Sequence, residues 1–390
     1  METKAPTNKA AWLPAKKVTP LVVGNAPYTP PGPGQIVVKN GAVGINPFDW
    51  GLQYQGAMIA SHLKYPMVLG VDVAGTVVEV GPDVTRFKVG DRVAGSAVSA
   101  AKESNTAAEG AFQLYTVMRQ HMVAPIPDHV TDEQAAVLGL GIGTAAYGLF
   151  HKDYLGLDMP QVPPPPNPQP GKKYPRAIIV TGGASSVGSC AVQLAASAGY
   201  EVLSTSSPKN FAYVKGLGAS HVFDYNSKTL VADLVRALEG RELVGAYTVG
   251  ANADRVCAAV MTERLSKTPE LPTRKFIALA GSARRNPDSI KGFLGPYRMM
   301  SGMMTMMGKN AVNKMLTGVE VKFILIVGLV DPESCVSHVY LDFLGPALAE
   351  KQFVPAPEPQ VVGRGLDKIN EALDLNQKGV SAKKIVVSLP

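Results

Sequence analysis

The stretch Ile178-Ile179-Val180-Thr181-Gly182-Gly183-Ala184-Ser185-Ser186-Val187-Gly188 decides the fold of this chain. Three β-prone residues lead into a turn rich in glycine and serine, and small or apolar residues then recur at helical spacing up to Ala198. A helix start offers unpaired backbone N–H groups and a positive dipole end, and glycine lets an anion come close. The stretch therefore predicts a strand, a phosphate-binding turn and a helix of the dinucleotide-binding type. Its spacing is G-G-x-x-x-x-G rather than G-x-G-x-x-G, so a packing turn without a ligand is the alternative.

The next predicted strand, 201–205, indicates which dinucleotide the turn would bind. A site for NAD usually has an Asp or Glu about 20 residues after the glycines, which holds the ribose 2′-hydroxyl. Here only hydroxyls, an amide and Lys209 follow the strand as far as Asn210. Because Ser207 and Lys209 can bind a 2′-phosphate that a carboxylate would repel, we expect NADPH rather than NADH. The alternative for Lys209 is an ordinary solvated lysine.

The composition is that of a globular protein with two domains. Of the 390 residues, 46% are hydrophobic and 18% are charged, which allows a sizeable core. The three cysteines, Cys190, Cys257 and Cys335, are too scattered for a disulfide framework and predict a reducing compartment. No apolar signal segment begins the sequence, and no apolar run is long enough to span a membrane. We expect a cytoplasmic protein that does not enter a membrane.

The net charge of +7 is partly local. Residues 263–298 contain three acidic and eight basic residues, the basic ones being Arg264, Lys267, Arg274, Lys275, Arg284, Arg285, Lys291 and Arg298. No aromatic and basic module of the kind that binds nucleic acid accompanies them, so we expect no nucleic-acid partner. A solvated surface is the simplest interpretation, and an acidic partner or an anionic handle on a substrate is the alternative.

Two kinds of pattern divide the chain. Up to about residue 140, short β-prone runs such as 35–39, 73–80 and 89–93 alternate with Gly, Pro and Asp, which indicates a barrel or sandwich. A proline-rich stretch at 160–171 predicts an extended surface loop. From 177 the pattern alternates as in a parallel sheet covered on both faces, an α/β fold, with strands at 177–181, 201–205, 220–224, 243–249 and 275–280 and helices at 187–198, 208–216, 229–238 and 252–265. The chain is expected to leave this repeat after about 320, and a last strand at 383–389 is expected to rejoin the first domain.

Several short motifs in a fixed order resemble the medium-chain dehydrogenase/reductase superfamily. They are Asn46-Pro47-Phe48-Asp49, the segments 69–77, 89–93 and 110–115, Thr144-Ala145, and the segment 380–386. The resemblance covers nearly the whole chain. It implies a GroES-like β-barrel catalytic domain, residues 1–143 and 323–390, and a Rossmann domain with a doubly wound parallel sheet, residues 144–322. It also implies a cofactor in the cleft between the two domains.

The residues at the metal positions of this family differ from those of its zinc-dependent members. Those members bind catalytic zinc through a Cys and a His-Glu pair. Here no cysteine precedes Cys190, and Gly70-Val71-Asp72 stands where the family has Gly-His-Glu. The six histidines are scattered without ligand spacing. We expect no metal, which favours reduction of an activated double bond by hydride delivery and an acid.

Within the zinc-free branch, the segments 206–211 and 223–225 resemble fungal-type trans-acting enoyl reductases, which serve polyketide synthases in secondary-metabolite biosynthesis. Three groups of residues would then bind the cofactor. The 2′-phosphate would be held by Ser207, Lys209, Asn210 and Tyr225. The pyrophosphate would be held by Ser185, Ser186 and Val187. The nicotinamide side would be lined by Asn46, Pro47, Phe48, Asp49, Thr144, Val380 and Ser381.

The residue that supplies the proton is less well marked. Gly51 stands where some relatives carry a Lys or Tyr, and Thr248 replaces the usual Asp of the fourth Rossmann strand. We predict Tyr54 as the acid and Thr144 as the residue that orients the nicotinamide ribose or the substrate. One alternative is a quinone or ketone oxidoreductase on the same scaffold. Another is an atypical pathway enzyme or a non-redox protein that keeps the dinucleotide site.

Half of the fourteen methionines lie within 299–315, at spacings of three and four, namely Met299, Met300, Met303, Met304, Met306, Met307 and Met315. Such a face suits a large apolar ligand, and core packing or a subunit contact is the alternative. Together with the basic residues before it, this face leads to the hypothesis that an apolar acyl substrate arrives on an acidic carrier domain. A monomer and a homodimer are both compatible with the sequence.

Overall fold

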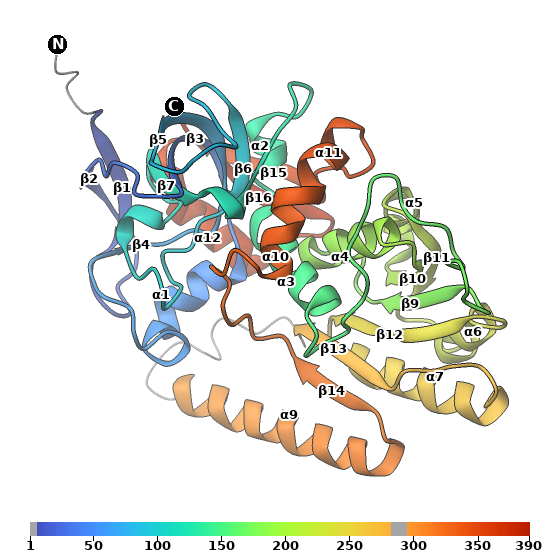
Figure 1. Cartoon of the computed structure of the whole chain (residues 1–390). Coiled ribbons are helices and arrows are strands. Elements are labelled where there is room, and N and C mark those ends of the chain that lie inside the picture. Colours follow the sequence, from blue (N-terminus) through green and yellow to red (C-terminus); the bar gives the residue numbers. More distant parts are fainter. Residues whose placement is uncertain (1–5, 282–294) are drawn as a thin grey trace. The chain divides into compact units, whose positions relative to one another are not determined.

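The predicted strand, turn and helix of the opening stretch are β9 (Arg176–Val180) and α4 (Ser186–Ser197). The computed structural model describes residues 6–281 and 295–390 (Figure 1). The described residues up to 140, together with 328–349 and 355–390, form a first unit, and those of 141–327 and 350–354 form a second. The boundary falls inside α3 (Gly139–Phe150).

The first unit is built on a seven-stranded sheet of spatial order β15-β16-β3-β5-β6-β8, in which β7 also pairs with β3. β15 and β16 run parallel, and the other neighbours are antiparallel. Its strands are β3 (Gln35–Gly44), β5 (Asp72–Val80), β6 (Arg92–Ser96), β7 (Tyr115–Arg119), β8 (Val123–Pro125), β15 (Glu358–Arg364) and β16 (Lys383–Ser388). The pairing of β16 with β3 confirms the predicted return of the last strand to this part of the chain.

In the described part of the first unit, a smaller antiparallel sheet and several α-helices accompany the large sheet. The sheet has the order β2-β1-β4, from β1 (Asn8–Leu13), β2 (Val22–Ala26) and β4 (Met67–Val68). The helices are α1 (Pro47–Ile59), α2 (Asp132–Ala135), α10 (Cys335–His338), α11 (Leu344–Ala349) and α12 (Ile369–Lys378). The first turn of α1 follows soon after β3, which places the predicted Asn46–Asp49 turn at the end of an interior strand of the large sheet.

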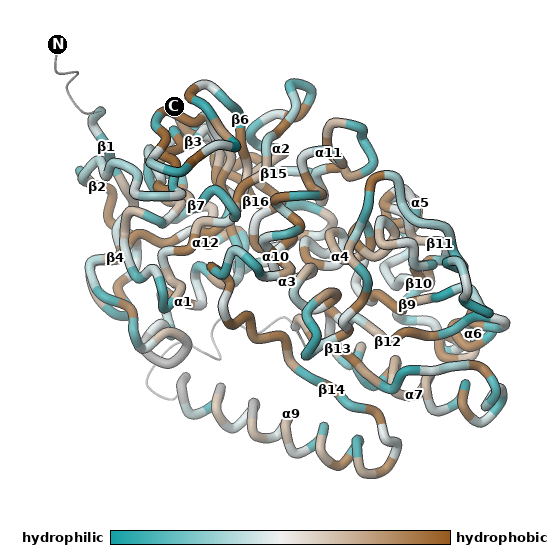
Figure 2. The backbone as a smooth tube through the Cα atoms, in the orientation of Figure 1, coloured by the Kyte–Doolittle hydropathy of each residue, from teal (hydrophilic) through white to brown (hydrophobic). Residues whose placement is uncertain are grey.

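The second unit is a six-stranded parallel sheet of order β11-β10-β9-β12-β13-β14. This order, with β9 central and the chain winding outward in both directions, is that of a doubly wound dinucleotide-binding sheet. The other strands are β10 (Glu201–Ser206), β11 (Ala219–Asp224), β12 (Glu242–Val249), β13 (Phe276–Gly281) and β14 (Glu320–Phe323). Residues 243–248 of β12 are buried, as expected for a strand that is covered on both faces, and Figure 2 shows hydrophobic stretches along this strand.

Helices cover the sheet of the second unit. They are α4, α5 (Phe211–Gly216), α6 (Leu230–Ala237) and α7 (Ala253–Lys267). α9 (Gly295–Thr317) precedes β14 in the chain, and its described side chains are mostly exposed. Leu234 of α6 and Met261 of α7 are fully buried in one cluster with Leu203 and Ile277 of the sheet. Gly199, with a φ of +79°, follows the last turn of α4, as its position in the sequence predicts.

Two sequence predictions need correction. The helix predicted at 208–216 is a single 3₁₀ turn at Pro208–Asn210 followed by α5. The parallel sheet does not end with the strand at 275–280, because β14 pairs with β13 as its edge strand and is too short to show a period. Residues 350–354 cluster with the second unit, where the side-chain amide of Gln193 binds the backbone of Val354 through two hydrogen bonds, at 2.8 and 3.1 Å.

Over the described part of the chain, no helix combines the length and the apolar character needed to cross a bilayer.

Candidate functional site

The turn between β9 and α4 needs its three glycines for steric reasons. Gly182 has a φ of +63°, which residues with a Cβ rarely adopt. A Cβ on Gly183 would lie 2.3 Å from Ser204 Oγ, and a Cβ on Gly188 would lie 2.1 Å from the carbonyl oxygen of Gly182. Contacts of a Cβ below 3.0 Å essentially do not occur in proteins, so the unusual spacing of the three glycines follows from the packing of this turn.

The start of α4 carries polar groups suited to an anion. The Oγ of Ser185 accepts a hydrogen bond from Gly188 N at 3.1 Å and donates one to Gly182 O at 2.7 Å. The amides of Ser186 and Val187 precede the first intrahelical hydrogen bond, from Ser189 N to Ser185 O. The hydroxyl of Ser186 is buried and has no hydrogen-bond partner among the described residues. Two open amides, an unpaired hydroxyl and a helix dipole fit a pyrophosphate, which a mere packing turn does not require.

A second layer of residues, which the sequence analysis missed, supports this turn. Ser189 Oγ donates to Gly183 O at 3.0 Å and shares a 2.8 Å hydrogen bond with Tyr213 Oη of α5. Ser189 follows the glycine turn by one residue, and this was the one local signal that could have marked it. Tyr213 lies far along the sequence, so its contribution depends on the packing of α5 beside α4.

The four residues predicted for the 2′-phosphate lie close together at the carboxyl ends of β10 and β11, which are adjacent parallel strands. Asn210 Nδ2 donates to Ser207 Oγ at 3.1 Å. Tyr225 N donates to Ser206 O at 3.4 Å. Lys209 is exposed, and Tyr225 is 55% exposed, so both side chains are accessible to an anion.

A carboxylate also lies at this edge of the sheet. Asp224 pairs in register with Ser206, and its Oδ1 accepts a hydrogen bond from Asn226 N at 2.9 Å. The sequence analysis included Asp224 in the segment 223–225 but looked for a carboxylate only after β10, whereas parallel pairing brings the end of β11 beside it. The site therefore combines an accessible cation with a carboxylate that is bound to its own turn.

In the first unit, the predicted Asn46–Asp49 turn is part of a buried polar cluster. Asp49 Oδ2 accepts a hydrogen bond from Asn46 N at 2.7 Å. Lys384 of β16 donates to Asn46 Oδ1 and forms an ion pair of 2.7 Å with Asp72 Oδ2 of β5. Asp72 Oδ1 accepts from Leu140 N at 2.6 Å. Sequence reasoning missed Lys384 as a member of this cluster, since its place in the motif 380–386 says nothing of its partners.

The carboxyl of Asp49 has an unusual proton affinity. Burial raises its pKa to about 7, and the negative charge of Asp72 acts in the same direction. The hydrogen bond from the Asn46 backbone and the charge of Lys384 lower the pKa but do not outweigh burial. A buried carboxyl with a pKa near neutrality is a common property of functional sites.

The remaining predicted residues lie in three places. Pro47 and Phe48 belong to the first turn of α1, and Phe48 is 36% exposed. Tyr54 lies further along α1, one residue before a break in helical geometry at Gln55. Val380 and Ser381 lie in the loop before β16, and Ser381 is exposed. Thr144 belongs to α3 in the second unit, where its carbonyl oxygen accepts a hydrogen bond from Tyr247 Oη at 3.1 Å.

The position that carries a His-Glu pair in zinc-dependent relatives has a different chemistry here. Asp72 is fully buried and is bound to Lys384 and to the backbone of Leu140. Among residues 6–281 and 295–390, no group of three or more His, Cys, Asp or Glu side chains could hold a metal ion. The cation next to Asp72 in the described structure is thus an ammonium group.

The basic stretch 263–298 is not simply a solvated surface, and that expectation is wrong for one of its members, Arg264. Arg264 is 1% exposed and donates to the carbonyl oxygen of Leu238 at the end of α6 at 2.6 Å. Arg274 donates to the carbonyl oxygen of Tyr154 at 2.7 Å. The cation of Arg264 thus serves packing, because burying a guanidinium requires such acceptors, whereas Arg274 is exposed. Three further basic residues lie outside the described residues, namely Arg284, Arg285 and Lys291.

The predicted methionine face lies on α9. The exposed fractions of its side chains are 54% for Met300, 69% for Met304, 61% for Met307 and 79% for Met315. Core packing is therefore wrong for these four residues, whereas an apolar ligand and a subunit contact stay as predictions. The side chains of Met299, Met303 and Met306 lie outside the described residues.

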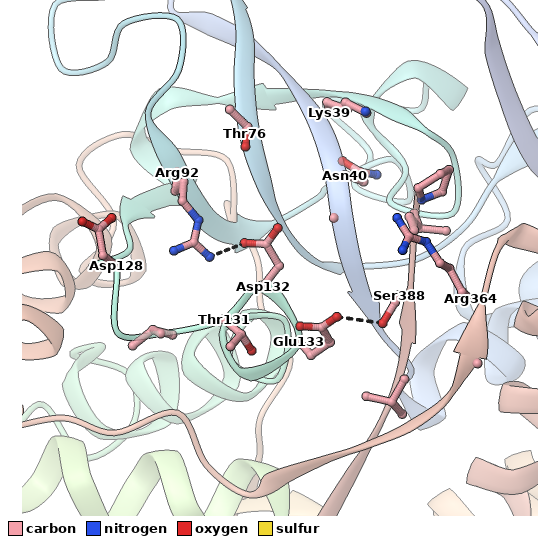
Figure 3. A pocket seen from close by; sticks show the side chains of 16 residues that line it. Lys39, Asn40, Thr76, Arg92, Asp128, Thr131, Asp132, Glu133, Arg364 and Ser388 are labelled. Carbon is pink, nitrogen blue, oxygen red and sulfur yellow. Dashed lines mark hydrogen bonds and ion pairs between the residues drawn. The ribbon is translucent and has the colours of Figure 1, made fainter.

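A separate open pocket of about 720 Å³ lies in the first unit (Figure 3). Three of its charged side chains have partners within the lining. Arg92 forms an ion pair of 2.5 Å with Asp132, and Ser388 Oγ donates to Glu133 at 2.8 Å. None of the predicted site residues lines it. It is therefore distinct from the Asn46–Asp49 cluster.

Comparison with known proteins matches both the fold and the motifs. Residues 32–128 match the model of the alcohol dehydrogenase GroES-like domain. Dehydrogenase pigH of Monascus ruber is 44% identical over 98% of this chain and 100% of its own length. The chain belongs to the medium-chain dehydrogenase/reductase superfamily. It is thus an oxidoreductase of a family that uses nicotinamide dinucleotides.

Further relatives confirm the predicted resemblance to fungal enoyl reductases and the predicted fold. Trans-enoyl reductase himH of Aspergillus japonicus is 32% identical over 98% of this chain and 97% of its own length. The crystal structure of an alcohol dehydrogenase superfamily protein from Novosphingobium aromaticivorans has a TM-score of 0.69 and 22% identity, covering 98% of this chain and 100% of that one. The combination of a GroES-like domain with a Rossmann-type parallel sheet, predicted from the sequence, is therefore confirmed.

Proposed function

We propose that the chain is an NADPH-dependent reductase of an activated carbon–carbon double bond, which acts in trans on an acyl chain held by a carrier domain and needs no metal. The main observation in support of this proposal is the start of α4. There, open amides and the unpaired Ser186 hydroxyl form a cradle for a pyrophosphate. Lys209 and Ser207 at the end of β10 favour a 2′-phosphate. The relatives named trans-enoyl reductase support the choice of substrate.

When bound, NADPH supplies a hydride for the β-carbon of the enoyl group. The residues of this chain would bind and orient the cofactor and would supply the proton to the substrate. The pyrophosphate would be held by Ser185, Ser186 and Val187, and the 2′-phosphate by Ser207, Lys209, Asn210 and Tyr225. The nicotinamide side would be lined by Asn46, Pro47, Phe48, Asp49, Thr144, Val380 and Ser381. The Tyr54 hydroxyl would hold the proton that the α-carbon receives, and water would return that proton to it.

The test measures NADPH consumption with four substrates and one comparison cofactor. The substrates are a free enoyl thioester, the same enoyl group on a phosphopantetheine carrier domain, a quinone and a simple ketone, and the comparison cofactor is NADH. We expect turnover of both enoyl substrates, faster with the carrier-bound one, and slower turnover with NADH. Turnover of the quinone alone would overturn the proposal in favour of a quinone reductase. Tight NADPH binding without any turnover would indicate a non-redox role.

Dialysis of the protein against a strong chelator tests the metal-free part of the proposal. Activity that survives dialysis against a strong chelator is expected, because the ammonium of Lys384 already neutralises Asp72. Loss of activity that added zinc restores would contradict the metal-free part of the proposal. The cytoplasmic location predicted from the sequence stays a prediction.

A further inference from the structure

Lys384 connects two segments that are predicted to line the nicotinamide side. It lies three residues after Ser381, and its side chain is 4% exposed. Its ammonium pairs with Asp72 at 2.7 Å and donates to Asn46, the residue before α1. The side chain thus joins β16, β5 and the start of α1.

The orientation of Asn46 depends on this ammonium. Asn46 is 1% exposed, and its Nδ2 has no hydrogen-bond partner among the described residues. Its Oδ1 accepts from Lys384, so this bond helps to hold the side-chain rotamer, together with the interaction of the Asn46 side chain with Asp49. A buried ammonium is tolerated only where such partners compensate for lost hydration.

We propose that Lys384 is a positioning residue for cofactor binding, which holds Asn46 and the first turn of α1 against β5 and β16. The inference rests on the proposed function, because it concerns residues that would contact NADPH. Lys384 acts through Asn46 rather than on the cofactor itself.

The adjacent lysine offers a matched control. Lys383 lies on the same strand, is 40% exposed and pairs at the surface with Glu358. We expect K384M to weaken NADPH binding about tenfold, which equals ~1.4 kcal/mol. K383M is expected to bind NADPH as the wild type does. Equal affinities of K384M and the wild type would overturn the proposal.

The single variant leaves Asp72 buried without its cation, which can prevent folding. The double variant K384M/D72N removes that charge, and the amide oxygen of the substituted side chain can still accept from Leu140 N. We expect K384M/D72N to recover the wild-type melting temperature while its NADPH affinity stays about tenfold weaker. An affinity that returns together with the melting temperature would show a purely structural role.

A measurement that needs no cofactor distinguishes failure of this inference from failure of the proposed function. Trp50 follows Asp49 in α1, is 7% exposed, and donates from Nε1 to Asn376 at 3.0 Å. Because the chain has two tryptophans, W12F makes Trp50 the sole reporter. In that background, K384M/D72N is expected to move the emission to longer wavelength, whereas K383M leaves it unchanged. If the wild type fails to bind NADPH, the proposed function fails, and an unmoved Trp50 emission would still refute the positioning of α1.

Discussion

Replacing Gly188 by alanine tests the phosphate turn. The new Cβ would lie 2.1 Å from Gly182 O, and because contacts below 3.0 Å do not persist, the turn must open by at least about 0.9 Å. Overpacking of this kind costs roughly 1–3 kcal/mol. The backbone cannot yield freely, since Gly182 N donates to Thr205 Oγ1 at 3.2 Å and Gly183 N donates to Thr205 O at 3.0 Å. The displaced atoms include the amides that would face the pyrophosphate.

Urea unfolding and NADPH titration measure the two consequences. We expect G188A to lower the free energy of unfolding by about 2 kcal/mol and to weaken NADPH binding at least about tenfold. G216A in α5 is the control, because a Cβ on Gly216 meets nothing within 4 Å. It should stay within about 0.5 kcal/mol of the wild type and bind NADPH equally well. Wild-type affinity in a folded G188A variant would refute the inference that this backbone holds the cofactor.

Three further substitutions test other parts of the site. K209A should raise the KM for NADPH about tenfold and leave that for NADH unchanged, since only NADPH presents a 2′-phosphate; equal losses for both cofactors would contradict this assignment. Asp49 has a folded-state pKa raised from 3.8 to about 7, so the folded chain keeps a proton that the unfolded chain releases, and stability should fall as the pH rises between these values. D49N should flatten that slope in urea melts across this range, and an unaltered slope would assign it to other groups. Y54F should lower kcat while the Kd for NADPH stays constant, and an unchanged kcat would remove Tyr54 from the proton-transfer role.

The parallel sheet was predictable because its signals are local. The run 178–188 combines a strand, a glycine turn and a helix start, and each alternation after it follows from the spacing of apolar residues. The predicted 208–216 helix failed at its first turn, where Pro208 begins a 3₁₀ turn. The prediction of a solvated surface for the basic residues after 263 was wrong for Arg264. Charge alone does not reveal that this residue is buried against the end of α6.

The sequence by itself determined that this chain forms a tight glycine turn at 182–188, because the positive φ of Gly182 and the close approach of Gly188 to Gly182 O are constraints within a few residues. Only the tertiary structure decided the cluster around Asn46. Lys384 is 338 residues away from it, and no local pattern encodes such a pair. Of the two neighbouring lysines, the pleat of β16 turned Lys384 inward and Lys383 outward, and that choice depends on the register of β16 against β3.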